Sequence, residues 1–222
     1  MSLTRKIKDP TDAKRRRMVE DYVMAKGVDD KRVIEAMLKV PRHLFVEPAL
    51  AELAYNDHAT PIGSSQTITQ PYTVAILAQE AELKGDECVL EVGTGSGYTT
   101  SILALLCQRV YTIERINSLS NKARKIFNKL GYNNIVCFTG DGTIGIAKHA
   151  PYDAIVVTAG APKVPIPLAK QLKPQARMVI PLDNGTGQIM TVVTRTKGMH
   201  FKVDKKADCS FVPLIGKHGW SK

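Results

Sequence analysis

Near the beginning of the chain, apolar residues recur with helical spacing in two stretches. Residues 12–26 place apolar side chains at near-helical intervals, and Gly27 is a typical helix stop. A second helix is predicted from a cap at Asp29 or Asp30 through Leu38, with its apolar residues on one face. These two helices predict an N-terminal layer that packs on the rest of the fold.

Between two further predicted helices, over 48–54 and 74–83, the chain shows little periodicity. Residues 55–73 are dense in hydroxyl and amide side chains but are not of low complexity. A loop of this length in a compact domain is usually functional or disordered. We therefore expect a functional loop here.

From residue 88 onward, short apolar runs alternate with helical stretches. The predicted strands cover 88–92, 109–113, 134–138, 153–158 and 176–180. The predicted helices between them cover 97–107, 117–130, 142–148 and 165–172. This alternation is typical of a parallel sheet with helices on both faces. After Pro181, strands over 188–194 and 201–211 predict an antiparallel pair at one edge.

The predicted fold is therefore α/β: a doubly wound, mostly parallel seven-stranded sheet of the Rossmann-like type with an N-terminal helical layer. No internal repeat is visible, so we expect one domain over 1–222. Residues 1–84 would supply the N-terminal helices and substrate loop, 85–182 the ligand-binding core, and 183–222 the C-terminal antiparallel strands.

Composition narrows the class of protein. The 222 residues, 44% of them hydrophobic, can bury one sizeable core. The net charge of +10 suits an acidic partner such as nucleic acid, but the basic residues are spread along the chain. We therefore interpret them, including the Lys-Arg-Arg-Arg run at 14–17, as a solvated surface and predict no nucleic-acid partner. No run of about 18 apolar residues is present, so no membrane association is expected.

The N-terminal residues and the metal-binding residue types add further expectations. Residues 1–17 are charged and lack the apolar core of a signal peptide, which predicts a cytoplasmic protein, and residues 1–9 are expected to be frayed. Neither the four cysteines nor the histidines show metal-ligand spacing, so no metal site or disulfide is predicted. His43 and His58 are interpreted as loop or surface residues, and Trp220 as a packing anchor.

The strand over 88–92 leads into the most informative motif. It contains Glu91 and is followed by Gly93-Thr94-Gly95-Ser96-Gly97 and a predicted helix start. Dinucleotide dehydrogenases favour G-x-G-x-x-G with a pyrophosphate at the helix N-terminus. Here the spacing is G-x-G-x-G, and a carboxylate precedes it, which favours a ligand with hydroxyls and a positive charge. S-adenosylmethionine (AdoMet) is the predicted cofactor.

Two more motifs follow neighbouring strands. Glu114 ends the second strand, where a carboxylate can accept both hydroxyls of a ribose. Asp141 and Gly142 follow the third strand, where an acid can meet the amino group of an adenine. The carboxyl ends of parallel strands meet at one edge of a sheet, which is where open α/β sheets bind ligands. The three motifs therefore predict one pocket.

Other functions remain as alternatives at this point. An RNA or DNA methyltransferase would suit the +10 charge, but residues 158–162 read Thr-Ala-Gly-Ala-Pro and lack the Asp/Asn-Pro-Pro-aromatic loop common in base N-methylation. A nicotinamide-dependent oxidoreductase is disfavoured by the glycine spacing. A module that binds AdoMet without turnover is the third alternative.

With these residues identified, the chain resembles the protein-L-isoaspartate(D-aspartate) O-methyltransferase family, a group of AdoMet-dependent class I methyltransferases. The resemblance runs from about residue 40 to residue 216. It rests on the glycine motif and on the segments Val-Pro-Arg-His-Leu-Phe-Val at 40–46, Gln-Thr-Ile-Thr-Gln-Pro-Tyr at 66–72, Tyr-Thr-Ile-Glu-Arg at 111–115, 140–142, 158–162 and Phe-Val-Pro-Leu at 211–214.

The resemblance implies an activity and a set of site residues. The activity would be methylation of the carboxyl group of L-isoaspartyl residues in damaged proteins, with S-adenosylhomocysteine as product, and the resemblance leaves open whether D-aspartyl residues are also accepted. The ester would then close to a succinimide without the enzyme. The residues implied to contact AdoMet are Thr67, Ile68, Tyr72, Glu91, Gly93, Thr94, Gly95, Ser96, Gly97, Glu114, Arg115, Asp141 and Gly142. Those implied to bind the substrate are Gln66, Thr69, Val212, Leu214 and Ile215.

Thr69 is the predicted catalytic residue. A carboxylic acid with a pKa of about 4 is already ionised at neutral pH, so the reaction needs no general base. Thr69 would donate a hydrogen bond to the substrate carboxylate, and the loop over 66–72 would close over the site. The family usually has Ser at this position, and Thr69 keeps the hydroxyl while adding a methyl group.

Overall fold

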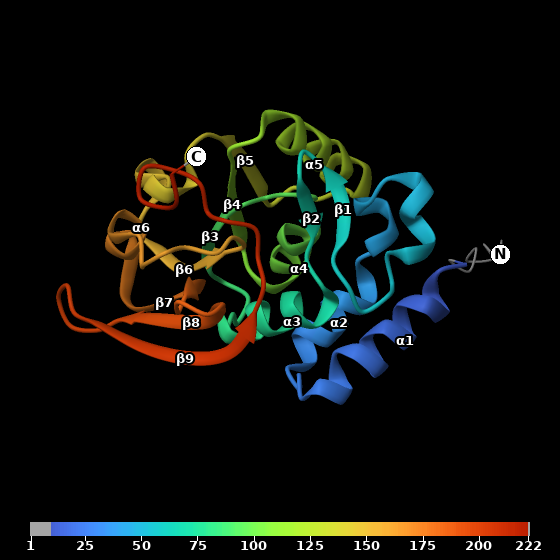
Figure 1. The fold of residues 1–222 in the computed structure, drawn as a ribbon, viewed down its shortest axis with the longest axis horizontal. Helices are drawn as coiled ribbons and strands as arrows, with labels where there is room; N and C mark the ends of the chain where they lie inside the picture. The colour runs from blue at the N-terminus through green and yellow to red at the C-terminus, as the bar shows by residue number, and fades with distance from the viewer. Residues whose placement is uncertain (1–9, 222) are drawn as a thin grey trace, which may run out of the picture.

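The computed structural model describes residues 10–221, and the expectation for residues 1–9 lies outside them. The main sheet has seven strands in the order β5-β4-β3-β6-β7-β8-β9 (Figure 1). Their bounds are β3 Cys88–Val92, β4 Arg109–Glu114, β5 Ile135–Thr139, β6 Tyr152–Val157, β7 Leu172–Asp183, β8 Gln188–Arg195 and β9 Phe201–Cys209. The strands from β5 to β7 are parallel, and β8 and β9 are antiparallel. The predicted α/β fold is confirmed, with the antiparallel pair at one edge.

Both faces of the sheet are buried at its centre. Along β6, Ala154 and Val156 pack in one apolar cluster while Ile155 and Val157 pack in the other, and each is at most 1% exposed. Such alternation follows from the period of two along a strand. Helices α1 to α5 contribute to the first cluster and α6 to the second. The helices are α1 Asp12–Tyr22, α2 Lys31–Lys39, α3 Pro71–Glu80, α4 Tyr98–Leu106, α5 Asn117–Leu130 and α6 Ile166–Lys170.

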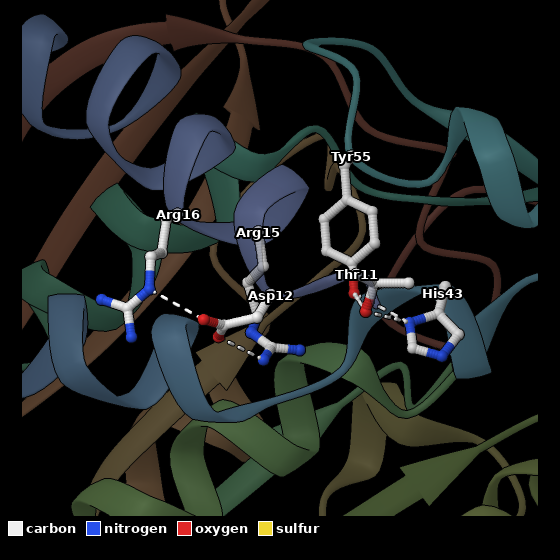
Figure 2. Close-up of polar contacts among 6 residues, drawn as sticks. All are labelled: Thr11, Asp12, Arg15, Arg16, His43 and Tyr55. Carbon is white, nitrogen blue, oxygen red and sulfur yellow. Dashed lines mark hydrogen bonds and ion pairs between the residues drawn. The ribbon is translucent and has the colours of Figure 1, made fainter. Parts of the chain in front are cut away.

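The N-terminal layer forms as its capping residues predict. The Asp30 side chain accepts hydrogen bonds from the backbone N–H groups of Arg32 and Val33 at the start of α2. Gly27 adopts a left-handed φ of 93° after the 3₁₀ helix η1, Met24–Lys26. The prediction of a solvated basic run at 14–17 is wrong for Arg15, which is 6% exposed and pairs with Asp12 at 2.9 Å (Figure 2).

The segment over 55–73 is not the irregular loop that the sequence predicts. It forms a two-stranded antiparallel hairpin, β1 Thr60–Gly63 and β2 Gln66–Ile68. Ser64 and Ser65 make the turn with φ values of 53° and 55°. Such primed turns usually carry Asn or Gly, so two serines give almost no sequence signal. The strands are also too short to show a period.

Three other elements differ from their predicted form. The helix predicted over 142–148 is two 3₁₀ turns, η4 Gly142–Ile144 and η5 Ala147–His149, because Gly145 between them has a left-handed φ of 67°. The helix predicted over 48–54 is the 3₁₀ helix η3, Pro48–Leu53, which follows η2, Arg42–Phe45. Strand β7 extends beyond 176–180, since it pairs with β8 as far as Asp183.

Two further features of residues 10–221 concern membrane-spanning helices and disulfides. None of the helices between residues 10 and 221 combines the length and the apolarity that crossing a bilayer requires. Cys88, Cys107, Cys137 and Cys209 all carry free thiols.

Candidate active site

A cavity opens at the carboxyl ends of β3 and β4, beside the loop that follows β6. The empty space in and in front of it, open solvent included, is about 700 Å³. The predicted site residues that line it are Gln66, Thr67, Ile68, Thr69, Gly93, Thr94, Gly95, Ser96, Glu114, Arg115, Gly142, Val212, Leu214 and Ile215. The structure therefore brings most of the predicted site residues together. That these residues contact a cofactor stays a prediction.

The glycine turn after β3 needs its glycines for two reasons. Gly93, Gly95 and Gly97 all have left-handed φ values, of 97°, 51° and 90°. A Cβ on Gly93 would lie 2.4 Å from Thr158 Oγ1, and one on Gly97 would lie 2.7 Å from the ring of Phe127. A ligand can therefore lie against bare backbone on one side of the turn, while Thr158 and Phe127 pack closely against it on the other.

A matched pair of substitutions separates these two reasons. Gly131 shares the left-handed conformation with φ 76°, but nothing lies within 4 Å of its missing Cβ. Gly131→Ala should lower the free energy of unfolding by about 1–2 kcal/mol. Gly97→Ala adds a clash with Phe127 and should lower it by about 3 kcal/mol or more. Urea unfolding of both variants measures the difference, and equal losses would show that the Phe127 contact relaxes freely.

Glu114, at the end of β4, is anchored by backbone donors. Its Oε2 accepts the N–H of Gly95 and its Oε1 the N–H of Ile116, both at 2.9 Å. A carboxylate has about four lone-pair sites, so two remain for a ligand. Glu114 lines the cavity and is 6% exposed. The structure thus presents a fixed acceptor pair next to the glycine turn.

Glu91 lies beneath the cavity and does not line it, so the implied direct contact with AdoMet has no support in the geometry. The side chain is fully buried, and its Oε2 accepts hydrogen bonds from the hydroxyls of Thr100 and Thr112 at 2.5 and 2.6 Å. The Thr112 hydroxyl also pairs with that of Thr94, a cavity residue, at 2.6 Å. Glu91 therefore reaches the site only through two hydroxyls.

Burial raises the pKa of Glu91 to about 8, and the two threonine hydroxyls offset only part of that rise. Since the pKa of an exposed glutamic acid is 4.5, the folded protein keeps a proton that the unfolded chain loses. Glu91 therefore contributes stability below pH 4.5 that is lost as the pH rises through 8.

Glu91→Gln tests this linkage, because glutamine does not titrate. The free energy of unfolding of Glu91→Gln minus that of the wild type should rise between pH 5 and pH 8.5, by about 3–5 kcal/mol. Urea unfolding at both pH values for both proteins gives the four numbers. Parallel pH dependence of the two proteins would mean that Glu91 titrates normally despite its burial.

Asp141 is bonded to the C-terminal segment and is not a lining residue of the cavity. Its carboxylate accepts hydrogen bonds from the N–H and hydroxyl of Thr143 and from the N–H of Lys217. Partial burial alone would raise the pKa of Asp141, but the Lys217 and Thr143 donors outweigh it and hold that pKa below its usual value. Asp141 is absent from the cavity lining while Gly142 is part of it, so contact with an adenine would have to use the remaining lone pair.

The C-terminal segment forms one wall of the cavity. In Figure 1 the chain after β9 runs back past β6 and β3. Pro213 bridges to Gly160, and the Trp220 indole donates to the Gly160 carbonyl at 2.9 Å. Trp220 is thus an anchor that helps to hold residues 212–215 at the cavity.

Some predicted residues lie elsewhere, and some lining residues had no predicted role. Tyr72 and Gly97 do not line the cavity; the Tyr72 ring lies 5.4 Å from the Lys26 ammonium. The lining residues without a predicted role are Val92, Thr99, Ile113, Thr158, Ala159 and Pro213. Thr158 closes the turn by donating to the Gly93 carbonyl at 2.5 Å. Its position at the carboxyl end of the strand predicted over 153–158 was the available signal.

The histidines take no part in the cavity lining. His43 pairs with the Tyr55 hydroxyl at 2.8 Å, beside Thr11 (Figure 2). Among residues 10–221 no group of three or more His, Cys, Asp or Glu side chains could hold a metal ion.

The fold and the cavity define an enzyme of the Rossmann-like methyltransferase class. The family model described as protein-L-isoaspartate(D-aspartate) O-methyltransferase matches residues 13–219. Protein-L-isoaspartate O-methyltransferase from Geobacter metallireducens is 51% identical over 209 residues, covering 94% of this chain and 97% of that protein. The protein of the same name from Syntrophus aciditrophicus is 50% identical over 215 residues, covering 96% and 99%. The chain belongs to the protein-L-isoaspartate(D-aspartate) O-methyltransferase family.

A solved structure agrees with the fold. The isoaspartate methyltransferase from Plasmodium falciparum, crystallised in complex with S-adenosyl-L-homocysteine, superposes with a TM-score of 0.79. The match covers 90% of this chain and 98% of that one at 24% sequence identity. The likeness therefore supports the sheet order and the helical layers described above.

Proposed function

We propose that this enzyme transfers the methyl group of AdoMet to the side-chain carboxylate of L-isoaspartyl residues in damaged proteins. The observation that carries the proposal is one cavity that joins the glycine turn and Glu114 to Thr69 and the Val212–Ile215 wall. Family membership favours this activity over RNA or DNA methylation. Whether D-aspartyl sites are accepted is a question for the same assay.

The chemistry of the cavity fits AdoMet. Glu114 is the acid among the lining residues, and its two spare lone-pair sites suit the hydroxyls of a ribose. The left-handed glycine turn leaves room for a ligand to lie against bare backbone. When bound, AdoMet supplies a methyl group made electrophilic by a positively charged sulfur. The relative from Plasmodium falciparum was crystallised with the demethylated product of that cofactor.

The protein's task at the other substrate is to hold an acid without protonating it. An exposed carboxylate is ionised at neutral pH, so alignment and desolvation limit the reaction rather than base catalysis. The Thr69 hydroxyl can donate a hydrogen bond to one carboxylate oxygen and leave the other free to attack. Strand β2 pairs with β1 alone among the described strands, so its open edge can bind an extended peptide by main-chain hydrogen bonds.

Labelled-methyl transfer tests this function directly. The protein is incubated with methyl-labelled AdoMet and two peptides of the same composition, one with an isoaspartyl and one with a normal aspartyl residue. We expect base-labile label on the isoaspartyl peptide only. Equal labelling of both peptides, or base-stable label, would contradict the proposed substrate.

Two broader expectations extend the proposal. We regard residues 1–222 as one methyltransferase domain, since the N-terminal helices share an apolar cluster with the sheet. We also place the enzyme in the cytoplasm with isoaspartyl-containing proteins as its partners.

A further inference from the structure

One segment that carries the family resemblance has no role in the site described so far. Residues 40–46 contribute no side chain to the lining of the main cavity. Yet Arg42, at the start of η2, is fully buried. Arginine is rarely buried without partners, because its charge must be compensated by hydrogen bonds. The question is what this guanidinium holds.

Arg42 joins two backbone carbonyls that are far apart in the sequence. Its Nε donates to the Ala54 carbonyl and its Nη2 to the Thr69 carbonyl, both at 2.7 Å. The guanidinium also lies over the Tyr98 ring, 4.7 Å from its centroid. No ion pair connects it to a carboxylate among residues 10–221. The contacts of the guanidinium are therefore with backbone carbonyls and a ring, and its third nitrogen, Nη1, is buried without a hydrogen-bond partner.

A neighbouring contact reinforces the same connection. His43 Nδ1 lies 2.8 Å from the Tyr55 hydroxyl, which donates to Thr11 at 3.3 Å (Figure 2). Residues 42 and 43 thus hold residues 54 and 55 through two adjacent side chains. Arg42 thus connects the N-terminal layer to Thr69 by one hydrogen bond.

The Thr69 carbonyl lies in the short connection between β2 and α3. Thr69 lies between Ile68, the last residue of β2, and the N-cap residue Gln70. No main-chain ladder bond of the hairpin fixes it, because the pairing of β1 with β2 ends at Ile68. A hydrogen bond to its carbonyl therefore sets the orientation of the whole residue, including the side chain that lines the cavity.

We propose that Arg42 is a positioning residue whose rigid fork fixes the Thr69 backbone against the N-terminal layer and so aims the Thr69 hydroxyl at the methyl-transfer site. This inference rests on the proposed function for the role of Thr69. Lysine at position 42 keeps the charge but has one nitrogen, which cannot reproduce the planar fork that meets both carbonyls. Arg42→Lys therefore removes the geometry and retains the charge.

Arg32 provides a matched control. It also bridges two backbone carbonyls, those of Leu83 and Leu106, at 2.5 and 2.8 Å. Neither carbonyl belongs to a residue that lines the cavity. Arg32→Lys should lower stability without touching the site.

The kinetic test compares both variants at saturating AdoMet, which also stabilises the folded state. Arg42→Lys should lower kcat on the isoaspartyl peptide by about 30-fold, since small misplacements at a reacting centre have effects up to about 100-fold. The dissociation constant of AdoMet should stay within about threefold, and Arg32→Lys should leave kcat within about threefold. An unchanged kcat in Arg42→Lys would overturn the proposal.

A double-mutant cycle separates positioning from a general structural effect. If Arg42 acts through the Thr69 hydroxyl, adding Arg42→Lys to Thr69→Val should lower kcat by less than about threefold more. Independent, multiplicative losses would overturn the proposal. If the wild type transfers no methyl group, the proposed function fails first. The positioning claim is then decided by hydrogen exchange, which Arg42→Lys should accelerate in residues 66–72 and Arg32→Lys should not.

The wild type provides a measurement in case Arg42→Lys does not fold. Its Arg42 guanidinium should show slow proton exchange and scalar coupling to the Thr69 carbonyl carbon by NMR. The NMR signals of the Arg42 guanidinium should also shift when the isoaspartyl peptide, but not the aspartyl peptide, is added with S-adenosylhomocysteine. Absence of the coupling or of the selective shift would overturn the proposal.

Discussion

Thr69→Val should lower kcat for methyl transfer to an isoaspartyl peptide by about 100-fold, the effect of losing one hydrogen-bond donor to a reacting oxygen. Valine has nearly the shape of threonine, so the half-buried side chain still fills its place beside the cavity. The dissociation constant of AdoMet, measured by calorimetry, should change by less than about threefold. The loss would thus fall on the chemical step.

Two controls accompany this substitution. Thr69→Ser keeps the hydroxyl and should retain most of the turnover. Thr194→Val removes an equally half-buried hydroxyl from β8, outside the cavity lining, and should leave kcat within about threefold. Full turnover in Thr69→Val would remove Thr69 from the mechanism.

Glu114→Ala should weaken AdoMet binding by about 100-fold or more, because each hydrogen bond to a charged group contributes about 1.5–3 kcal/mol. The substitution removes the acceptors proposed for the ribose and also releases the N–H groups of Gly95 and Ile116. Isothermal titration calorimetry measures the change in the dissociation constant.

Glu87→Ala is the matched control for Glu114→Ala. Glu87 also accepts two backbone N–H groups, those of Lys84 and Gly85, but it lies in the turn before β3 and outside the cavity lining. Glu87→Ala should lower stability and leave AdoMet binding unchanged. Equal AdoMet affinity in Glu114→Ala and the wild type would exclude Glu114 from the pocket.

The parallel sheet was predictable because its strands are apolar runs with clear boundaries. Residues 88–92 and 117–130 are predicted with the bounds that the structure gives to β3 and α5. The β1–β2 hairpin was missed, because its turn uses Ser64 and Ser65 where Asn-Gly would have marked it. Secondary structure can be predicted from local sequence where periods are regular and turns are standard. It cannot be predicted in this way where tertiary contacts impose the conformation.

The site likewise contains residues whose positions could be predicted from the sequence and residues whose positions could not. The glycine turn and Glu114 could be predicted, since the ends of neighbouring parallel strands must meet. The position of Glu91 could not, because the sequence does not say on which side of the strand a carboxylate is buried with Thr100 and Thr112. Nor could the Arg42 contact with Thr69, which joins residues 27 positions apart.

A crystal structure of this enzyme with S-adenosylhomocysteine and an isoaspartyl peptide would test the proposed roles of the glycine turn, Glu114 and Thr69 together. We expect the cofactor product along the glycine turn, its ribose on Glu114, and the peptide carboxylate within hydrogen-bond distance of the Thr69 hydroxyl and facing the sulfur. A carboxylate held elsewhere, with Thr69 turned away from the sulfur, would contradict the proposed role of Thr69 in methyl transfer.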